Sequence, residues 1–263
     1  MNDERSGDAR GRSMVADALE MDEALLDDAA ELLADLDALG SDPEWIAEVI
    51  AELPLPPEPR ILDLCCGKGA VAEAIADAVR GAVVHGVDLH PALIAAARER
   101  PGARGSYEVG DATDLPRPST LYDVALIAAV GDVLGGFDVT ARLLREQVRP
   151  GGWLVIADVW VDSEAETMHP LFAEHGDRAS IEAALTSHGD RLVACHADDE
   201  EEAAEDGDED DWLARIAERG AAITRRQPEK AELVAAYLRD QAEEDAWLQA
   251  HATEAIWVLE RGA

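Results

Sequence analysis

The ten residues ILDLCCGKGA, residues 61–70, decide the fold of this 263-residue chain. An apolar run that breaks into small residues and glycines is typical of a buried strand turning tightly into a helix. Gly67, Gly69 and Ala72 match the pattern G-x-G-x-x-A, and Asp88 follows at the distance where a dinucleotide-binding fold places its ribose acid. On spacing alone, the turn fits NAD, but it fits a cofactor with a different chemistry equally well.

Two acidic residues outside the glycine pattern favour a cofactor other than NAD. Asp63 stands four residues before Gly67, where a carboxylate is badly placed beside a pyrophosphate but suits a ligand with positive charge. A second acid, Asp111, lies in the segment GDATDLP, where it and the backbone of Ala112 can hydrogen-bond the edge of an adenine. These positions favour a cationic cofactor that carries adenosine.

Apolar strands and alanine-rich helices alternate after residue 59, which predicts a parallel sheet with helices on both faces. The expected strands are residues 60–64, 82–88, 105–109, 122–128, 153–158, 191–196 and 254–261. The expected helices are residues 70–79, 91–100, 133–148 and 180–187.

Two additions flank this core, so we expect an N-terminal helical extension or lid over residues 1–58 and a main domain over residues 59–263. Apolar spacing predicts an amphipathic helix over residues 14–39. The segment SDPEW predicts a second helix over residues 42–52, with Ser41 as its cap. Inside the domain, residues 197–249 form an insertion that begins with an acidic run and continues with two helical patterns, which we expect to pack as a cap.

Five segments, in their order and spacing, resemble the successive motifs of the class I S-adenosylmethionine-dependent methyltransferases. They are ILDLCCGKGA, VHGVDLHP, GDATDLP, YDVALIAAVGDVLGG and VRPGGWLVIADVW, and together they cover about residues 59–158. The resemblance implies a Rossmann-like sheet of seven strands in the order 3-2-1-4-5-7-6, with strand 7 antiparallel. It also implies S-adenosyl-L-methionine as the cofactor and methyl transfer to an acceptor.

The resemblance further implies which residues bind that cofactor. Asp63 and Gly67 would lie around its methionine part with Gly69 supporting the turn, and Ala128 would offer backbone near the sulfonium. Asp88 would take the ribose hydroxyls. The remaining adenine contacts would be Leu89, Asp111 and Ala112. Cys65 departs from the family pattern, because that position is usually glycine.

The acceptor site should form beyond the carboxyl ends of the strands, where doubly wound sheets bind ligands. Gly131 follows the fourth expected strand, and Asp158 and Trp160 follow the fifth, with Trp160 either a pocket wall or part of the core. Asp132 is a candidate base that equally suits a helix cap, and His169 is a further candidate base in a loop where a surface role is also open. His175 and His90 have weaker claims.

The charge of the chain limits its partners. It carries 22 basic residues against 57 acidic ones, a net charge of -35, and only Lys68 and Lys230 are lysines. Such a composition resembles haloarchaeal proteins, since high salt screens the self-repulsion. Without a basic stripe to replace phosphate counterions, nucleic acid is not an expected partner.

The remaining composition points to a cytoplasmic protein with reduced thiols. Cys65, Cys66 and Cys195 match neither a disulfide framework nor zinc-ligand spacing, and no metal is expected. Neither a signal peptide nor an apolar run near the roughly 18 residues of a membrane span is present. The prediction is a small-molecule methyltransferase. Two alternatives stay open: a non-catalytic S-adenosylmethionine-binding protein and an NAD-dependent oxidoreductase.

Overall fold

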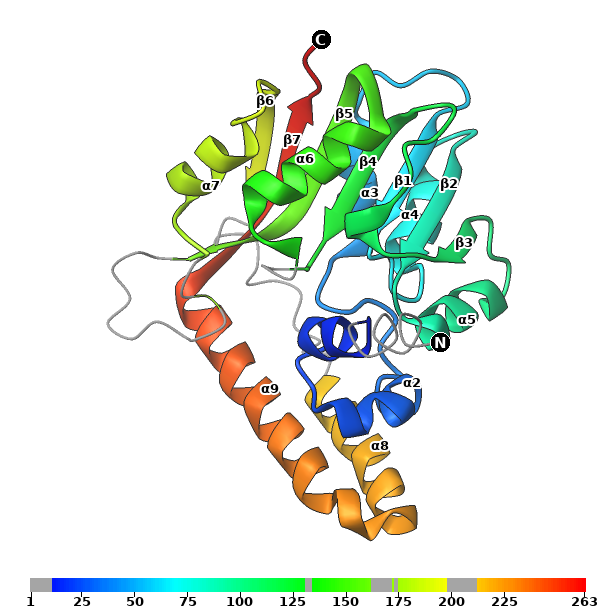
Figure 1. The fold of residues 1–263 in the computed structure, drawn as a ribbon, viewed down its shortest axis with the longest axis vertical. Helices are drawn as coiled ribbons and strands as arrows, with labels where there is room; N and C mark the ends of the chain where they lie inside the picture. Colours follow the sequence, from blue (N-terminus) through cyan, green and yellow to red (C-terminus); the bar gives the residue numbers. More distant parts are fainter. Residues whose placement is uncertain (1–10, 131–133, 162–171, 173–174, 198–211) are drawn as a thin grey trace, which may run out of the picture. The chain divides into compact units, whose positions relative to one another are not determined.

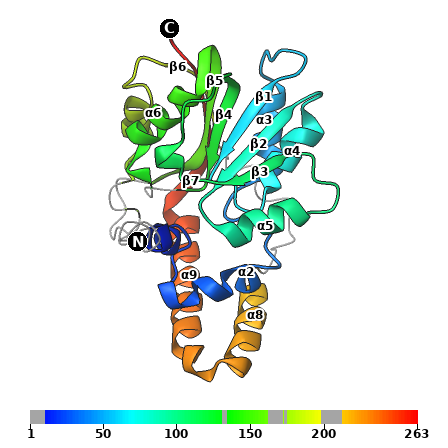
Figure 2. The ribbon, with the colours of Figure 1, turned by 45° about the vertical axis from the view of Figure 1, so that its right-hand side comes forward.

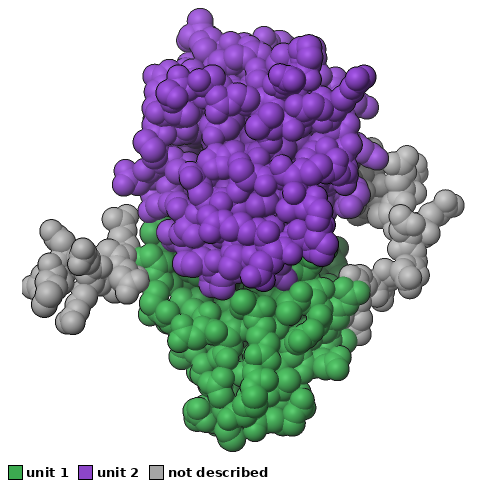
Figure 3. Space-filling model, turned by 90° about the vertical axis from the view of Figure 1, so that its right-hand side faces the viewer, with its two compact units in different colours: residues 1–37, 199–251 green, residues 38–198, 252–263 purple. Residues whose placement is uncertain are grey.

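The computed structural model describes residues 11–130, 134–161, 172, 175–197 and 212–263. Their contacts group the chain into two compact units, coloured separately in Figure 3. Unit 1 holds residues 1–37 and 199–251, and unit 2 holds residues 38–198 and 252–263. Residues 38–58, which the sequence places in the N-terminal extension, therefore group with the sheet.

Unit 2 is built on one sheet of seven strands in the order β3-β2-β1-β4-β5-β7-β6 (Figure 1). The strands are β1 (Arg60–Leu64), β2 (Val83–Asp88), β3 (Ser106–Val109), β4 (Tyr122–Ala128), β5 (Val148–Val161), β6 (Arg191–Ala197) and β7 (Ala252–Glu260). Strands β1 to β5 pair in parallel, whereas β7 runs antiparallel to both β5 and β6. The predicted order and the antiparallel seventh strand are confirmed.

Helices cover both faces of the sheet (Figure 2). They are α3 (Pro43–Ala51), α4 (Ala70–Ala78), α5 (Pro91–Glu99), α6 (Phe137–Gln147) and α7 (Arg178–Leu185), with the 3-10 turn η2 (Ala112–Asp114). One buried cluster joins α3, α4 and α5 to the sheet, for example through Ile50, Ile75 and Ile94. A second cluster joins α6 and α7 to it through Leu144 and Leu185. The central strands are buried on both sides, which explains their nearly continuous apolar sequences.

Unit 1 is helical. It contains a helical segment at residues 11–18, η1 (Glu23–Asp28), α2 (Ala29–Leu32), α8 (Trp212–Arg226), η5 (Pro228–Lys230) and α9 (Ala231–His251). Ion pairs connect its two stretches of sequence: Arg219 Nε lies 2.6 Å from Asp35 Oδ2, and Arg226 pairs with Glu31. Within the described part of the chain, no helix combines the length and the apolar character needed to cross a membrane.

The predicted continuous helix over residues 14–39 is wrong. Glu20 adopts a left-handed φ of 50°, and Asp22 then begins η1 by accepting a hydrogen bond of 2.8 Å from the Ala24 N–H. The predicted cap of the next helix is also wrong, because Asp42 and not Ser41 accepts the Trp45 N–H at 2.9 Å. A carboxylate at the N-cap satisfies an amide that the helix leaves unpaired.

Two boundaries near the acceptor end of the sheet also differ from the prediction. Helix α6 begins at Phe137, not near residue 133, because Gly135 and Gly136 have φ values of 101° and 90° that no helix accepts. Strand β5 extends from residue 148 to 161, well beyond the predicted 153–158. Its antiparallel pairing with β7 continues to Val161, so the pair runs past the end of the parallel sheet.

Candidate active site

Asp63 is the most unusual group at the carboxyl end of β1. Its side chain is 2% exposed, and its Oδ2 atom has no hydrogen-bond partner among the described residues. Burial, followed by the neighbouring charge of Asp88, raises the pKa of Asp63 from 3.8 to about 8. A carboxyl in this state is prepared to ionise when a positive group arrives.

The turn after β1 has the left-handed backbone that its glycines predict. Gly67 and Gly69 have φ values of 52° and 77°. At Gly69, an added Cβ would lie only 2.6 Å from the hydroxyl oxygen of Tyr107, so this position also needs glycine for space. Cys65 has a φ of 59°, which explains why glycine is usual there, and burial raises the pKa of its thiol.

Asp88 ties the end of β2 to the glycine turn. Its Oδ2 accepts the Gly67 N–H at 2.9 Å, and its Oδ1 accepts the His90 N–H at 2.7 Å. Desolvation raises the pKa of Asp88 despite these two bonds. Each carboxylate oxygen retains a second lone pair, so the group can still accept bonds from a pair of vicinal hydroxyls.

The other predicted cofactor residues lie at the same ends of the strands. Asp111 caps η2 and accepts both the N–H and the hydroxyl of Thr113 through its Oδ1, at 2.8 and 2.6 Å. Ala112 is buried, while Leu89 and Ala128 are half-buried. The backbone N–H of Gly110 donates to the Asp88 carbonyl at 3.0 Å, which holds the Asp111 turn beside the end of β2.

A polar pair beneath the glycine turn was missed from the sequence. Tyr107, on β3, donates its hydroxyl to Glu73 Oε1 at 2.6 Å, and its ring lies against Gly69 and Gly86. Glu73, in the first turn of α4, also accepts the backbone N–H groups of Arg104 and Gly105, each at 3.0 Å to Oε1. The sequence feature that could have predicted this pair is a tyrosine in a short strand close to two glycines.

On the acceptor side, Asp158 forms a pair with His175. Its Oδ1 accepts the Val159 N–H at 2.8 Å and the His175 Nε2–H at 3.2 Å, although His175 had only a weak claim from the sequence. Trp160 packs edge-on against Trp257 with ring centroids 6.0 Å apart, and Arg178 lies over its ring at 5.3 Å. Trp160 therefore packs against Trp257 and Arg178, and its place in the acceptor site stays a prediction. The remaining predicted residues, Gly131, Asp132 and His169, lie outside the described residues.

These groups fit an adenosine-containing cation better than a dinucleotide. The buried Asp63 oxygen, which has no partner in the part of the chain that the structure describes, suits a positively charged group, and two backbone N–H groups already orient Asp88. A pyrophosphate beside Asp63 would bring like charges together in a buried place. Among the described residues, no group of three histidine, cysteine, aspartate or glutamate side chains is arranged to hold a metal ion.

The comparison with known families agrees with this geometry. Residues 61–152 match the family model described as a methyltransferase domain. This part of the chain is similar to known methyltransferase domains. The match begins in β1 and ends at Gly152 in β5, so the domain contains the glycine turn, Asp88 and Asp111.

Individual relatives match about half of this chain. A demethylmenaquinone methyltransferase from Thermus thermophilus is 33% identical over 49% of this chain and 60% of its own length. A trans-aconitate 2-methyltransferase from Paracidovorax citrulli is 31% identical over 48% of each chain. The chain thus spans about half the length of the curated relatives that it matches.

A solved structure extends the likeness of fold beyond the domain. The S-adenosyl-L-homocysteine complex of a SAM-dependent methyltransferase from Thiobacillus denitrificans has a TM-score of 0.69 with this chain. The similarity covers 88% of this chain and 96% of that one at 21% sequence identity. This likeness shows that the two chains share a Rossmann-like fold.

Proposed function

We propose that this chain binds S-adenosyl-L-methionine at the carboxyl ends of β1, β2 and β3 and transfers its methyl group to a small molecule. The observation that carries the proposal is the buried Asp63 carboxyl, whose Oδ2 has no partner within the described structure. A buried carboxyl without a cation is costly, and a cationic ligand removes that cost. The methyltransferase domain supports the same cofactor.

Different residues of the chain then bind different parts of the cofactor. Asp63 ionises and pairs with the positive charge of the methionine part, while Asp88 accepts the ribose hydroxyls. The Asp111 turn, with the backbone of Ala112, borders the adenine. Since Gly67 N–H holds Asp88, the turn and the ribose site are fixed together before a ligand arrives, which lowers the entropy lost on binding.

The chemistry is an in-line displacement. The bound cofactor supplies a methyl group on a cationic sulfur, and the protein has to align the acceptor with that bond and exclude water. A base is needed only when the acceptor must lose a proton. Asp132 and His169 stay predictions for that role, and Gly131 stays a predicted acceptor contact.

A small molecule fits as acceptor better than nucleic acid. Two relatives are named for methylating demethylmenaquinone and trans-aconitate, both small molecules. A net charge of -35 opposes the approach of a polyanionic nucleic acid. That the N-terminal extension and the helical insertion close over the acceptor stays a prediction, as does a cytoplasmic location.

Calorimetric titration tests the proposal and separates it from both alternatives. The full chain in molar KCl is titrated with S-adenosylmethionine, S-adenosylhomocysteine and NAD. We expect binding of the first two ligands and none of NAD, and we expect Asp63→Asn to weaken binding of S-adenosylmethionine at least tenfold.

Asp77→Asn is the matched control, because Asp77 is an exposed carboxylate on α4 that pairs only with Arg104 in the described ion pairs. Binding of NAD alone would overturn the proposal. Binding of S-adenosylmethionine without labelled methyl transfer to any compound of a cell extract would favour a non-catalytic binding protein.

A further inference from the structure

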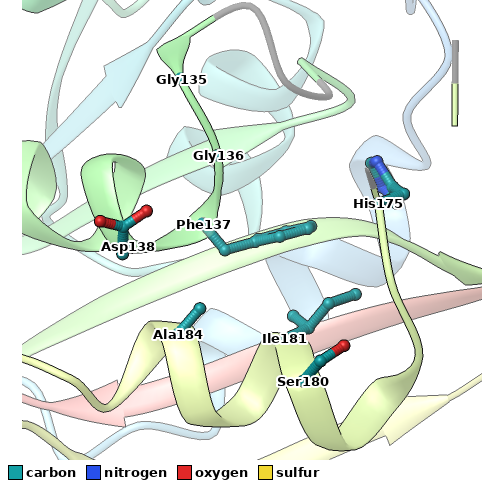
Figure 4. A pocket seen from close by; sticks show the side chains of 8 residues that line it. All are labelled: Gly135, Gly136, Phe137, Asp138, His175, Ser180, Ile181 and Ala184. Carbon is teal, nitrogen blue, oxygen red and sulfur yellow. The ribbon is translucent and has the colours of Figure 1, made fainter. Parts of the chain in front are cut away.

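The first turns of α6 and α7 border a pocket of about 400 Å³ that none of the cofactor residues line (Figure 4). Its walls come from the loop after β4, from the start of α6, from His175 and from one face of α7. The lining residues are Gly135, Gly136, Phe137, Asp138, His175, Ser180, Ile181 and Ala184. A space of this size accepts a small organic molecule.

The sheet connects the strand that holds His175 to the strand that carries Asp63 through one intervening strand, β4. Asp63 on β1 pairs in register with Leu126 on β4, and Ala128 on β4 pairs with Ala157 on β5. Asp158, the next residue of β5, holds His175 on the wall of the pocket. Because neighbouring strands lie about 4.8 Å apart, two strand spacings, about 10 Å, separate β1 from β5.

One side of the pocket is apolar. Figure 4 shows the Phe137 side chain extending from α6 toward His175, with Ile181 and Ala184 presented by α7. The rings of Phe137 and His175 meet edge to face with centroids 5.2 Å apart. An acceptor that enters here gains by burying an apolar body against Phe137 and Ile181.

The polar side chains of the pocket include one carboxylate and one imidazole, and the imidazole of His175 lies 3.2 Å from the Asp158 carboxylate, which offsets the charge of its protonated form. Asp138 contributes a carboxylate, and no lining residue that the structure describes is a lysine or an arginine. Arg178, at the start of α7, donates to Glu182 at 2.8 Å and stacks on Trp160, so its charge is offset.

Neutral hydrogen-bonding groups are also present. The Ser180 hydroxyl donates to the Asp177 carbonyl at 2.7 Å and can still accept a bond. At the start of α6, Gly136 provides no side-chain cap, which leaves backbone N–H groups to donate to an uncharged oxygen. The Asp138 carboxylate in that same turn offsets the positive end of the helix dipole, which reduces its attraction for an anion.

We propose that this pocket receives the methyl acceptor and that it selects an uncharged or cationic molecule with an apolar body over an anionic one. The inference rests on the proposed function for the identity of the ligand as an acceptor. The charge preference itself rests on the Asp138 carboxylate, on the pairing of His175 with Asp158, and on the absence of lysine and arginine among the described lining residues.

Three fluorinated probes of matched shape test the charge preference. Binding of 4-fluorobenzyl alcohol, 4-fluorobenzylamine and 4-fluorobenzoate to the full chain is followed by fluorine NMR in molar KCl with saturating S-adenosylhomocysteine. We expect the alcohol and the amine to bind at least tenfold more tightly than the benzoate. Equal or tighter binding of the benzoate, or no binding of any probe, would overturn the inference.

Two neighbouring alanines locate the binding. Ala184→Trp fills the pocket and should abolish binding of the alcohol and the amine, whereas Ala183→Trp, one residue away and exposed, should leave it unchanged. Equal binding in the two variants would show that the probes bind elsewhere and would overturn the inference.

Titration with S-adenosylhomocysteine, run on the same samples without probes, reports on the proposed function separately. Loss of probe binding in Ala184→Trp with intact S-adenosylhomocysteine binding supports both proposals. If the wild-type chain binds the alcohol and the amine but not S-adenosylhomocysteine, the proposed function fails while the pocket and its preference stand.

Discussion

The backbone N–H of Gly67 donates a hydrogen bond of 2.9 Å to the carboxylate of Asp88, 21 residues further along the chain. This bond joins the turn after β1 to the end of β2, so the residue expected to take the ribose also holds the turn that borders the methionine part. A single carboxylate thereby shapes two regions of the proposed cofactor site.

Replacing Asp88 should therefore weaken cofactor binding more than it weakens the fold. A hydrogen bond to a charged group contributes about 1.5–3 kcal/mol, so loss of the ribose bonds in Asp88→Ala should lower affinity for S-adenosylhomocysteine at least tenfold. Calorimetry measures the affinity, and circular dichroism in the same buffer checks the fold. Unchanged affinity in a folded Asp88→Ala variant would remove Asp88 from the site.

Asp63 should couple cofactor binding to proton release. Its pKa in the folded chain, about 8, lies above the unfolded value of 3.8, so near pH 7 the carboxyl is largely protonated. A cationic ligand favours the ionised form, and affinity should rise with pH up to about 8. Titrations at pH 7 in phosphate and in Tris, whose ionisation enthalpies differ, should show release of close to one proton. Identical heats in the two buffers would contradict the coupling.

The raised pKa of Asp63 also predicts how the stability of the ligand-free protein depends on pH. A raised folded-state pKa means that the contribution of Asp63 is fully present below about pH 4 and is lost as pH rises through 8. Asp63→Asn, which cannot ionise, should be more stable than the wild type at pH 9, with the difference shrinking toward pH 5. Urea unfolding at the two pH values measures it, and a constant difference would show that Asp63 does not titrate as described.

Cys65 should be a site of backbone strain. Its φ of 59° is left-handed, and such a conformation costs a residue with a Cβ about 1 kcal/mol relative to glycine. Cys65→Gly should raise the free energy of unfolding by roughly that amount, whereas Cys65→Ala keeps the Cβ and should not. Equal stability of the two variants would mean that the φ value carries no cost.

Much of unit 2 was predictable because its signals are local. Strands β1 and β4 have the predicted bounds, since each is an apolar run that ends where small residues begin. The order of the strands came from the family resemblance and not from spacing. Helix α6 was predicted to start too early because an apolar pattern carries no information about the positive φ values of Gly135 and Gly136.

The contacts between residues that lie far apart in the sequence were not predictable. His175 and Asp158 are 17 residues apart, and Tyr107 and Glu73 are 34 apart, so no sequence period relates either pair. The N-terminal segment failed for another reason. Its apolar spacing fits a helix, but the left-handed Glu20 breaks that helix before η1 begins.

Salt should stabilise the chain. The Debye length falls from about 10 Å at 0.1 M salt to about 3 Å at 1 M, which screens the repulsion of a net charge of -35. Surface ion pairs such as Arg219 with Asp35 weaken at the same time, but each contributes little. The midpoint of thermal unfolding should rise between 0.1 and 2 M KCl. A midpoint that falls would contradict a halophilic origin.

The most direct test of cofactor identity is calorimetric titration of the full chain with S-adenosylhomocysteine at pH 8 in molar KCl, alongside Asp63→Asn. We predict one site per chain, affinity at least tenfold weaker in Asp63→Asn, and no heat with NAD. Absence of S-adenosylhomocysteine binding by a folded wild-type chain, or binding of NAD in its place, would contradict the assignment of Asp63 to the methionine part and of Asp88 to the ribose of the proposed cofactor.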